Sequence, residues 1–288
     1  MLALLLTAAL LTAGPAWRRG LGLALALVAA ACPLFLDGPP LLRGLAATAT
    51  FWAAARILDL AREGRPLGPG KRLAHTVALI DIRSLQPVAP WFDRRAWVRL
   101  PVWLAAAMLA LHGATHTAIL PLRWALGALF VYTLAESANS LAHAVLAAVG
   151  QRSPPLHRTP IAACSLKEFW GERWNLPVSR WLRAHFFMPQ ARRRRPRLGL
   201  ALAFLASAGL HAWIVAVAVG PAMAAIMASY FVVQGLLLAL EVRLGVARWT
   251  EAAGWAWTMA CVLVPSPLFI EPLLRVVEPA RALLALHV

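Results

Sequence analysis

The sequence predicts an all-α, polytopic integral membrane protein with about eight or nine transmembrane helices and additional interfacial helices. The composition carries this prediction: 61% of the 288 residues are hydrophobic and 14% are charged, whereas soluble domains are nearer half apolar and a quarter charged. The apolar residues also lie in long runs, which is typical of membrane-spanning helices. The runs do not alternate in polarity, which excludes an outer-membrane β-barrel.

The apolar runs give the expected spans in chain order. The first, Leu2–Ala16, is shorter than the ~20 residues that a span usually needs, so we expect it to be tilted or re-entrant. The whole chain, residues 1–288, is treated as a single integral membrane domain. The other candidate spans are Leu21–Leu36, Leu41–Leu58, Val98–Ile119, Trp124–Val149, Leu198–Val219, Ala222–Leu240 and Ala252–Ile270, with a weaker ninth at Leu273–Val288.

The net charge of +16 comes overwhelmingly from arginine. In a soluble protein this balance would suggest nucleic-acid binding, but the sequence contains no nucleic-acid-binding motif. Cytoplasmic loops of membrane proteins collect Lys and Arg, and the arginines here gather in the loops 59–95, 150–197 and 243–248. We therefore place these loops inside and expect a multi-pass protein of a bacterial inner membrane, in contact with lipid and not with nucleic acid.

The sequence does not support metal or disulfide chemistry. The three cysteines are far apart and form no C-x-x-C pair. His112 and His116 form H-x-x-x-H, which places two imidazoles on one helix face. Membrane di-iron enzymes need further boxes with paired histidines, and the remaining histidines are isolated. We therefore expect no metal and no bound cofactor.

One short stretch, Cys164–Asn175 ("CSLKEFWGERWN"), crowds aromatic and polar residues into the second inside loop. Ser165 followed by Glu168 fits a capping box at a helix start, and Pro177 can open a second short helix. A pair of interfacial helices would explain the tryptophans, because tryptophan and arginine favour the membrane interface. This interpretation leaves Asn175 unexplained.

His211 lies within the apolar run "LASAGLHAWIVAVAV". An ionisable group at such depth by default faces a cavity or a polar partner. The alternative is a neutral histidine that only hydrogen-bonds a backbone carbonyl. Both interpretations remain open on the residues alone.

These stretches together resemble the signature of the membrane-bound O-acyltransferase (MBOAT) family, specifically its wax synthase-like branch. The motif region is residues 150–245: Pro160, then "SLKEFWGERWN", then a helix with "SAGLH", then "VVQGLLLALE" ending at Glu241. The F-W-x-x-R-W-N core is specific, because these residue types rarely arise at fixed spacing by chance. The resemblance implies an MBOAT-like fold and an acyltransferase. Such an enzyme would move a fatty acyl group from acyl-CoA, its co-substrate, to a long-chain or other hydrophobic alcohol.

By match to the family motif, the catalytic residues are His211 and Asn175. A neutral imidazole can take a hydroxyl proton near pH 7, and a carboxamide can donate a hydrogen bond to a developing oxyanion. The sequence departs from the family pattern at two positions near these residues. Ala212 follows the histidine where the family commonly has an acidic residue, and Gln234 stands where the family often has a histidine before a glycine. The expected substrate-binding residues of the motif are Trp170, Arg173, Trp174 and Arg180, the arginines serving the phosphates of acyl-CoA.

Glu136, Asn139, Ser140 and His143 fall on one face of the predicted span Trp124–Val149. Such a stripe must face protein or a cavity. It either lines the tunnel for the acceptor alcohol or ties helices together. Three of these residues are therefore further candidates for substrate binding: Glu136, Asn139 and His143.

The competing hypothesis is a non-enzymatic polytopic membrane protein, either a lipid-binding protein or a transporter. Transporters often contain repeated halves with broken spans in matching positions. The sequence shows no such symmetry, which favours the enzyme.

Overall fold

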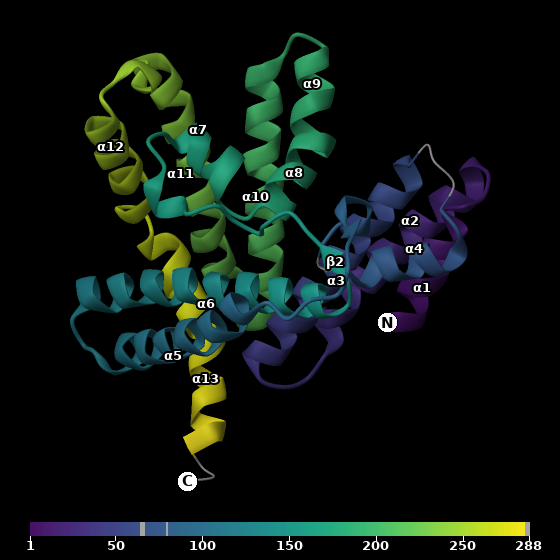
Figure 1. The fold of residues 1–288 in the computed structure, drawn as a ribbon, viewed down its shortest axis with the longest axis horizontal. Coiled ribbons are helices and arrows are strands. Elements are labelled where there is room, and N and C mark those ends of the chain that lie inside the picture. The colour runs from purple at the N-terminus through teal and green to yellow at the C-terminus, as the bar shows by residue number, and fades with distance from the viewer. Residues whose placement is uncertain (64–66, 79, 286–288) are drawn as a thin grey trace. The chain divides into compact units, whose positions relative to one another are not determined.

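The structure, a computed structural model, describes residues 1–63, 67–78 and 80–285 (Figure 1). Within these residues, two strands, β1 (Gln86–Pro87) and β2 (Gln151–Arg152), form a short antiparallel pair, and the other regular elements are helices. The predicted all-α polytopic fold is confirmed. The chain divides into two compact units, and the prediction that it acts as one domain stays a prediction.

Five helical segments of the described chain are long and apolar enough to cross a membrane, and a bent pair adds a sixth if it forms one span. The bent pair is α12 and α13, which meet at an angle of 46°. The protein is thus a multi-pass integral membrane protein, as predicted. The five are α2 (Ala16–Ala31) continued by η1 (Cys32–Phe35), α3 (Pro40–Arg62), α5 (Arg94–His116), α10 (Pro196–Val219) and α11 (Pro221–Leu244).

The described helices that are long and apolar enough to span number five or six, fewer than the eight or nine predicted. The first expected span is α1 (Leu2–Leu11), whose ten residues cover only about 15 Å, half of the ~30 Å hydrocarbon layer. A turn at 12–14 ends α1, and α2 begins after Pro15.

Two further expected spans also differ from their predicted form. The helix α6 (Leu120–Ala148) has 29 residues and covers most of the expected span Trp124–Val149, but it is not among the helices that are both long and apolar enough to span. The expected span Ala252–Ile270 is broken into α12 (Glu251–Leu263) and α13 (Pro267–Ala285), because Pro265 and Pro267 interrupt the helix. The weak ninth span is the continuation of α13, and its last residues, 286–288, lie outside the described residues.

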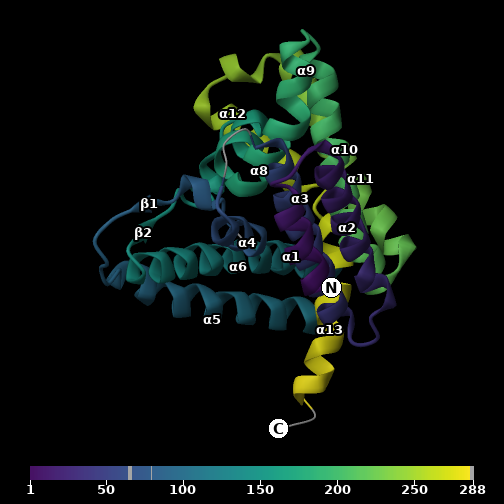
Figure 2. The ribbon, with the colours of Figure 1, turned by 90° about the vertical axis from the view of Figure 1, so that its right-hand side faces the viewer.

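Unit 1 comprises Met1–Ser84, Trp213–Ala224 and the chain from Arg275. Figure 2 shows α1, α2 and α3 lying side by side in this unit. Small side chains at the contacts let membrane helices approach closely. The buried alanines of this core are Ala8, Ala9, Ala26, Ala29 and Ala53.

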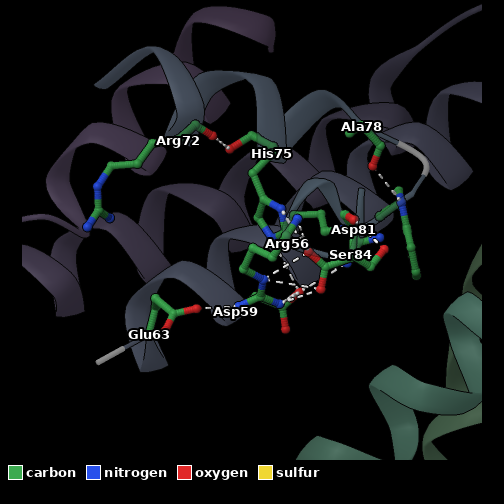
Figure 3. A network of polar contacts seen from close by, with 11 residues as sticks. Arg56, Asp59, Glu63, Arg72, His75, Ala78, Asp81 and Ser84 are labelled. Carbon is green, nitrogen blue, oxygen red and sulfur yellow. Dashed lines mark hydrogen bonds and ion pairs between the residues drawn. The ribbon is translucent and has the colours of Figure 1, made fainter. Parts of the chain in front are cut away.

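A buried polar network in unit 1 connects α3 with α4 (Pro69–Val77) and η2 (Ile82–Ser84) (Figure 3). At its centre, the Asp59 carboxylate lies 3.2 Å from Nη1 of Arg56 and 3.5 Å from Nε2 of His75. All three side chains are buried. Charges removed from water need partners, so the network holds α3 and α4 together at fixed positions.

Arg83 extends this network toward the surface of unit 1. It donates to Glu63 at 2.6 Å and to Asp81 at 2.7 Å. Burial acts to raise the pKa of Asp81, but the hydrogen bonds from Arg83 outweigh it, so the pKa lies below its usual value. A lowered pKa means that Asp81 contributes stability above its unfolded-state pKa, near 4, and loses that contribution as the pH falls through the folded-state pKa.

Unit 2 comprises Leu85–Ala212 and Ala225–Leu274. Its α5 and α6 form an antiparallel hairpin that both views show (Figures 1 and 2). Short helical pieces fill the long segment between α6 and α10, and one more precedes α12. These pieces are η3 (Pro160–Ala162), α7 (Leu166–Glu168), η4 (Phe169–Arg173), α8 (Leu176–Leu182), η5 (Arg183–Phe187), α9 (Met188–Arg192) and η6 (Val246–Arg248).

Candidate active site

A cavity of about 1290 Å³ lies in unit 2, and all of its lining residues belong to that unit. Its walls come from α6, the segment 160–187, α10, α11 and the α12–α13 junction, and most of the lining side chains are aromatic or aliphatic. Ligand pockets usually measure ~300–1000 Å³, so this cavity suits a larger apolar molecule. His211 on α10 and Asn175 before α8 both line it.

The motif segment begins with the first turn of α7, where side chains accept hydrogen bonds from the backbone N–H groups. Ser165 Oγ accepts from the Glu168 backbone N–H at 3.0 Å, as the predicted capping box requires. Glu168 Oε2, however, accepts from the Cys164 N–H at 2.7 Å rather than from that of Ser165. The hydrogen bond that Glu168 accepts in this capping box is therefore shifted by one residue, from the N–H of Ser165 to that of Cys164.

Glu241 on α11 completes this helix start from outside the segment. Its buried carboxylate accepts from the backbone N–H groups of Leu166 at 2.6 Å and Lys167 at 3.1 Å. A carboxylate is favourable at a helix N-terminus because the first N–H groups have no partner within the helix. Glu241 also accepts from Trp257 Nε1 at 3.1 Å, so it links the motif segment to α12.

Gln234 makes a second link from the same helix. Its Oε1 accepts from Trp170 Nε1 at 3.1 Å, and its Nε2 donates to the Cys261 carbonyl at 2.8 Å. No role was predicted for Gln234 or Glu241 from the sequence. A signal was present: two polar residues seven positions apart in an apolar helix lie on one face, and such residues need partners inside the membrane.

The aromatic side chains of the motif pack inside unit 2. Leu166 and Phe169 are 0% and 7% exposed. The Trp170 ring meets those of Phe204 and Tyr230 edge-on, with centroids 6.1 and 6.3 Å apart. Gly254 lets α12 approach closely, because a side chain there would meet the Cys164 carbonyl. Trp170 thus packs within the site and does not act as a membrane-surface anchor.

Asn175 occupies an unusual backbone position. After the π-helical turn η4, its φ of 41° and ψ of 58° are left-handed, a conformation that asparagine adopts more readily than most residues. Pro177 then lies in the first turn of α8, as predicted. Among the described contacts, the Asn175 side chain does not cap α8, and it lines the cavity instead.

His211 is held by its helix and by two aromatic rings. Its Nδ1 lies 2.8 Å from the Ser207 carbonyl oxygen. A carbonyl only accepts, so Nδ1 carries the proton of this bond and Nε2 of the neutral ring is an acceptor. The ring stacks on Phe231 at 4.1 Å and meets Phe269 at 6.0 Å. His211 therefore bonds a backbone carbonyl and also lines a cavity, so both earlier interpretations hold in part.

The other expected motif residues divide into two groups. Trp174 lines the cavity, as Trp170 does, and stacks on Phe169. Arg173 donates to Glu168 at 2.6 Å and to the Arg158 carbonyl at 3.1 Å. Of the described residues around the cavity, Arg173 and Arg180 are not part of its lining. Three other cations line it: Lys167, Arg183 and Arg197.

The polar stripe of α6 is likewise outside the lining that the structure describes. Asn139 Oδ1 accepts from the Leu156 N–H at 3.0 Å. Glu136 Oε1 lies 3.1 Å from His157 Nε2. These contacts tie α6 to the loop after β2, which is the second of the two roles considered for the stripe. Substrate binding by Glu136, Asn139 and His143 stays a prediction.

Fold and site together define a polytopic membrane protein with a lipid-sized cavity that presents an imidazole and a carboxamide. Residues 153–233 match the family model described as "Membrane bound O-acyl transferase family". The predicted resemblance to this family is thereby confirmed over this segment, and the curated relatives that the chain matches are named as long-chain-alcohol O-fatty-acyltransferases.

Two of these relatives come from Arabidopsis thaliana. "Probable long-chain-alcohol O-fatty-acyltransferase 2" is 30% identical over 140 residues, which cover 44% of this chain and 41% of the relative. "Probable long-chain-alcohol O-fatty-acyltransferase 3" is 31% identical over 137 residues, which cover 42% and 40%. The chain thus spans about two fifths of the length of the curated relatives it matches.

Proposed function

We propose that this protein is a membrane-bound O-acyltransferase that transfers a fatty acyl group from acyl-CoA to a long-chain or other hydrophobic alcohol. One observation carries the proposal: His211 and Asn175 lie on the wall of the same apolar cavity, in unit 2, which contains most of the family segment. The relatives' names describe fatty-acyl transfer to long-chain alcohols, which supports the same class of enzyme. We place it in a bacterial inner membrane, with acyl-CoA as co-substrate and no bound cofactor.

The chemistry follows from the two side chains. Nε2 of His211 takes the hydroxyl proton as the alcohol oxygen attacks the thioester carbonyl. The carboxamide of Asn175 donates a hydrogen bond to the oxyanion of the tetrahedral intermediate. The C–S bond then breaks, the ester is released, and the proton on His211 passes to the departing thiolate of CoA. Atoms and charge balance without any further reactant.

The cavity supplies the setting for this reaction. Its apolar walls fit a fatty chain, and they exclude the water that would otherwise hydrolyse the thioester. Lys167, Arg183 and Arg197 line it and are exposed, so they are placed to bind the phosphates of acyl-CoA. In the proposal they replace Arg173, whose guanidinium is engaged by Glu168 and backbone carbonyls.

Lipid analysis of expressing cells tests the proposal. Cells are fed a labelled fatty acid together with a panel of alcohols of different chain length and class. We expect a new labelled ester with at least one alcohol, and we expect it to be missing from cells that express His211→Ala at the same level. If no alcohol gives an ester, the protein is better explained as a non-enzymatic lipid-binding protein or transporter.

A further inference from the structure

A loop that we call the strap, residues 153–159, runs between β2 and η3 in unit 2. It pairs with the motif segment through two backbone hydrogen bonds. The Arg158 N–H donates to the Arg173 carbonyl at 2.8 Å, and the Leu176 N–H donates to the Leu156 carbonyl at 2.7 Å. These bonds fix the backbone on both sides of Asn175, two residues before it and one residue after it.

The other side of the strap is held by the polar stripe of α6. Asn139 Oδ1 accepts from the N–H of Leu156, the same residue whose carbonyl receives Leu176. Glu136 lies 3.1 Å from the ring of the neighbouring residue, His157. That ring is buried, and it stacks on Trp174 with centroids 6.2 Å apart. Two sets of contacts therefore connect α6 to the residues that flank Asn175. Asn139 acts through Leu156, and Glu136 acts through His157.

We propose that Asn139 and Glu136, which the sequence predicted to bind substrate, instead act as positioning residues for Asn175. The inference rests on the proposed function, in which the Asn175 carboxamide meets the oxyanion. A left-handed backbone is uncommon for residues other than glycine, although asparagine tolerates it. The direction of the Asn175 side chain therefore depends on the flanking bonds that hold this backbone. A misplacement of about 1 Å at a reacting centre can cost ~10²-fold in rate.

Asn139→Leu is the first test, because leucine has a similar size and cannot accept the hydrogen bond from Leu156. We expect kcat to fall by roughly 10- to 100-fold, with KM values for acyl-CoA and alcohol within about twofold of wild type, because no contact with substrate is removed. Asn139→Asp keeps an acceptor oxygen and should restore most of kcat. Ser137→Ala is the matched control and should leave kcat unchanged. Ser137 is buried on the same helix, and among the described residues its hydroxyl donates to the Thr133 carbonyl alone.

A double-mutant cycle separates positioning from a general loss of stability. If Asn139 acts through Asn175, then Asn139→Leu should have little further effect in an Asn175→Gly background. An equal loss in both backgrounds, or full activity of Asn139→Leu, would overturn the inference. Should Asn139→Leu fail to fold, Glu136→Gln is the second variant: a kcat loss with unchanged KM supports the inference, and unchanged kcat opposes it. An inactive wild type would instead refute the proposed function, so the two failures are distinguishable.

Discussion

His211→Ala is expected to lower kcat for ester formation by about 10²- to 10⁴-fold, the range that a general base contributes. The reason is the tautomer fixed by the fold: Nδ1 is bonded to the Ser207 carbonyl, which leaves Nε2 to take the hydroxyl proton. Alanine removes this base but should leave the acyl-CoA binding constant near wild type. The measurement is turnover of purified protein with saturating acyl-CoA and alcohol, beside thermal unfolding in the same detergent.

A second histidine provides the control for this variant. His112→Ala changes an exposed imidazole on α5 that, among the described residues, is not part of the cavity lining. It should retain full turnover. If His211→Ala also keeps full turnover, the imidazole is a packing partner of Phe231 and the assignment of a general base is wrong.

The second large effect is expected at Asn175, and glycine is the informative replacement. Asn175 has a φ of 41°, which glycine adopts without steric cost whereas alanine does not. Asn175→Gly therefore removes the carboxamide and keeps the backbone. Loss of one oxyanion donor typically costs ~10²–10³ in kcat, and we expect that loss here with a thermal unfolding midpoint close to wild type.

Two further variants sharpen this prediction. Asn175→Asp keeps the shape of the side chain but cannot donate when ionised, and it places a negative charge beside the oxyanion, so it should be at least as slow as Asn175→Gly. Arg194→Gly is a matched control, because Arg194 also has a positive φ, of 58°, and is not part of the described cavity lining. Equal activity of Asn175→Gly and Arg194→Gly would mean that the carboxamide has no part in catalysis.

The fold class could be predicted from the sequence because membrane-spanning helices are encoded as long apolar runs. It was less informative about where those runs break. Hydropathy did not distinguish a ten-residue helix followed by a turn at 12–14 from one short span. It also joined α12 to the start of α13, although two prolines divide them.

The site could be predicted only in part, for a reason that lies in the backbone. Arg173 was expected to meet substrate phosphates, yet it bonds Glu168, five positions earlier. Residues five apart do not meet on a regular α-helix. The π-helical turn brings Arg173 and Glu168 together; in it the Trp174 N–H donates to the Phe169 carbonyl. No pattern of residues in the sequence predicted this turn. The resemblance supplied His211 and Asn175, whereas only the folded chain shows that they share a cavity.

The central claim is that a fatty acyl chain occupies the cavity that holds His211 and Asn175. Photolabelling measures this directly: wild-type protein in lipid nanodiscs is irradiated with a fatty acyl-CoA that carries a diazirine near the chain end, and the modified residues are mapped by mass spectrometry. We predict label on cavity residues such as Phe204, Tyr230 and Met259, and its loss when unlabelled acyl-CoA is added in excess. Label confined to exposed apolar residues such as Leu109 on α5, which is 73% exposed, with no competition by acyl-CoA, would contradict the account.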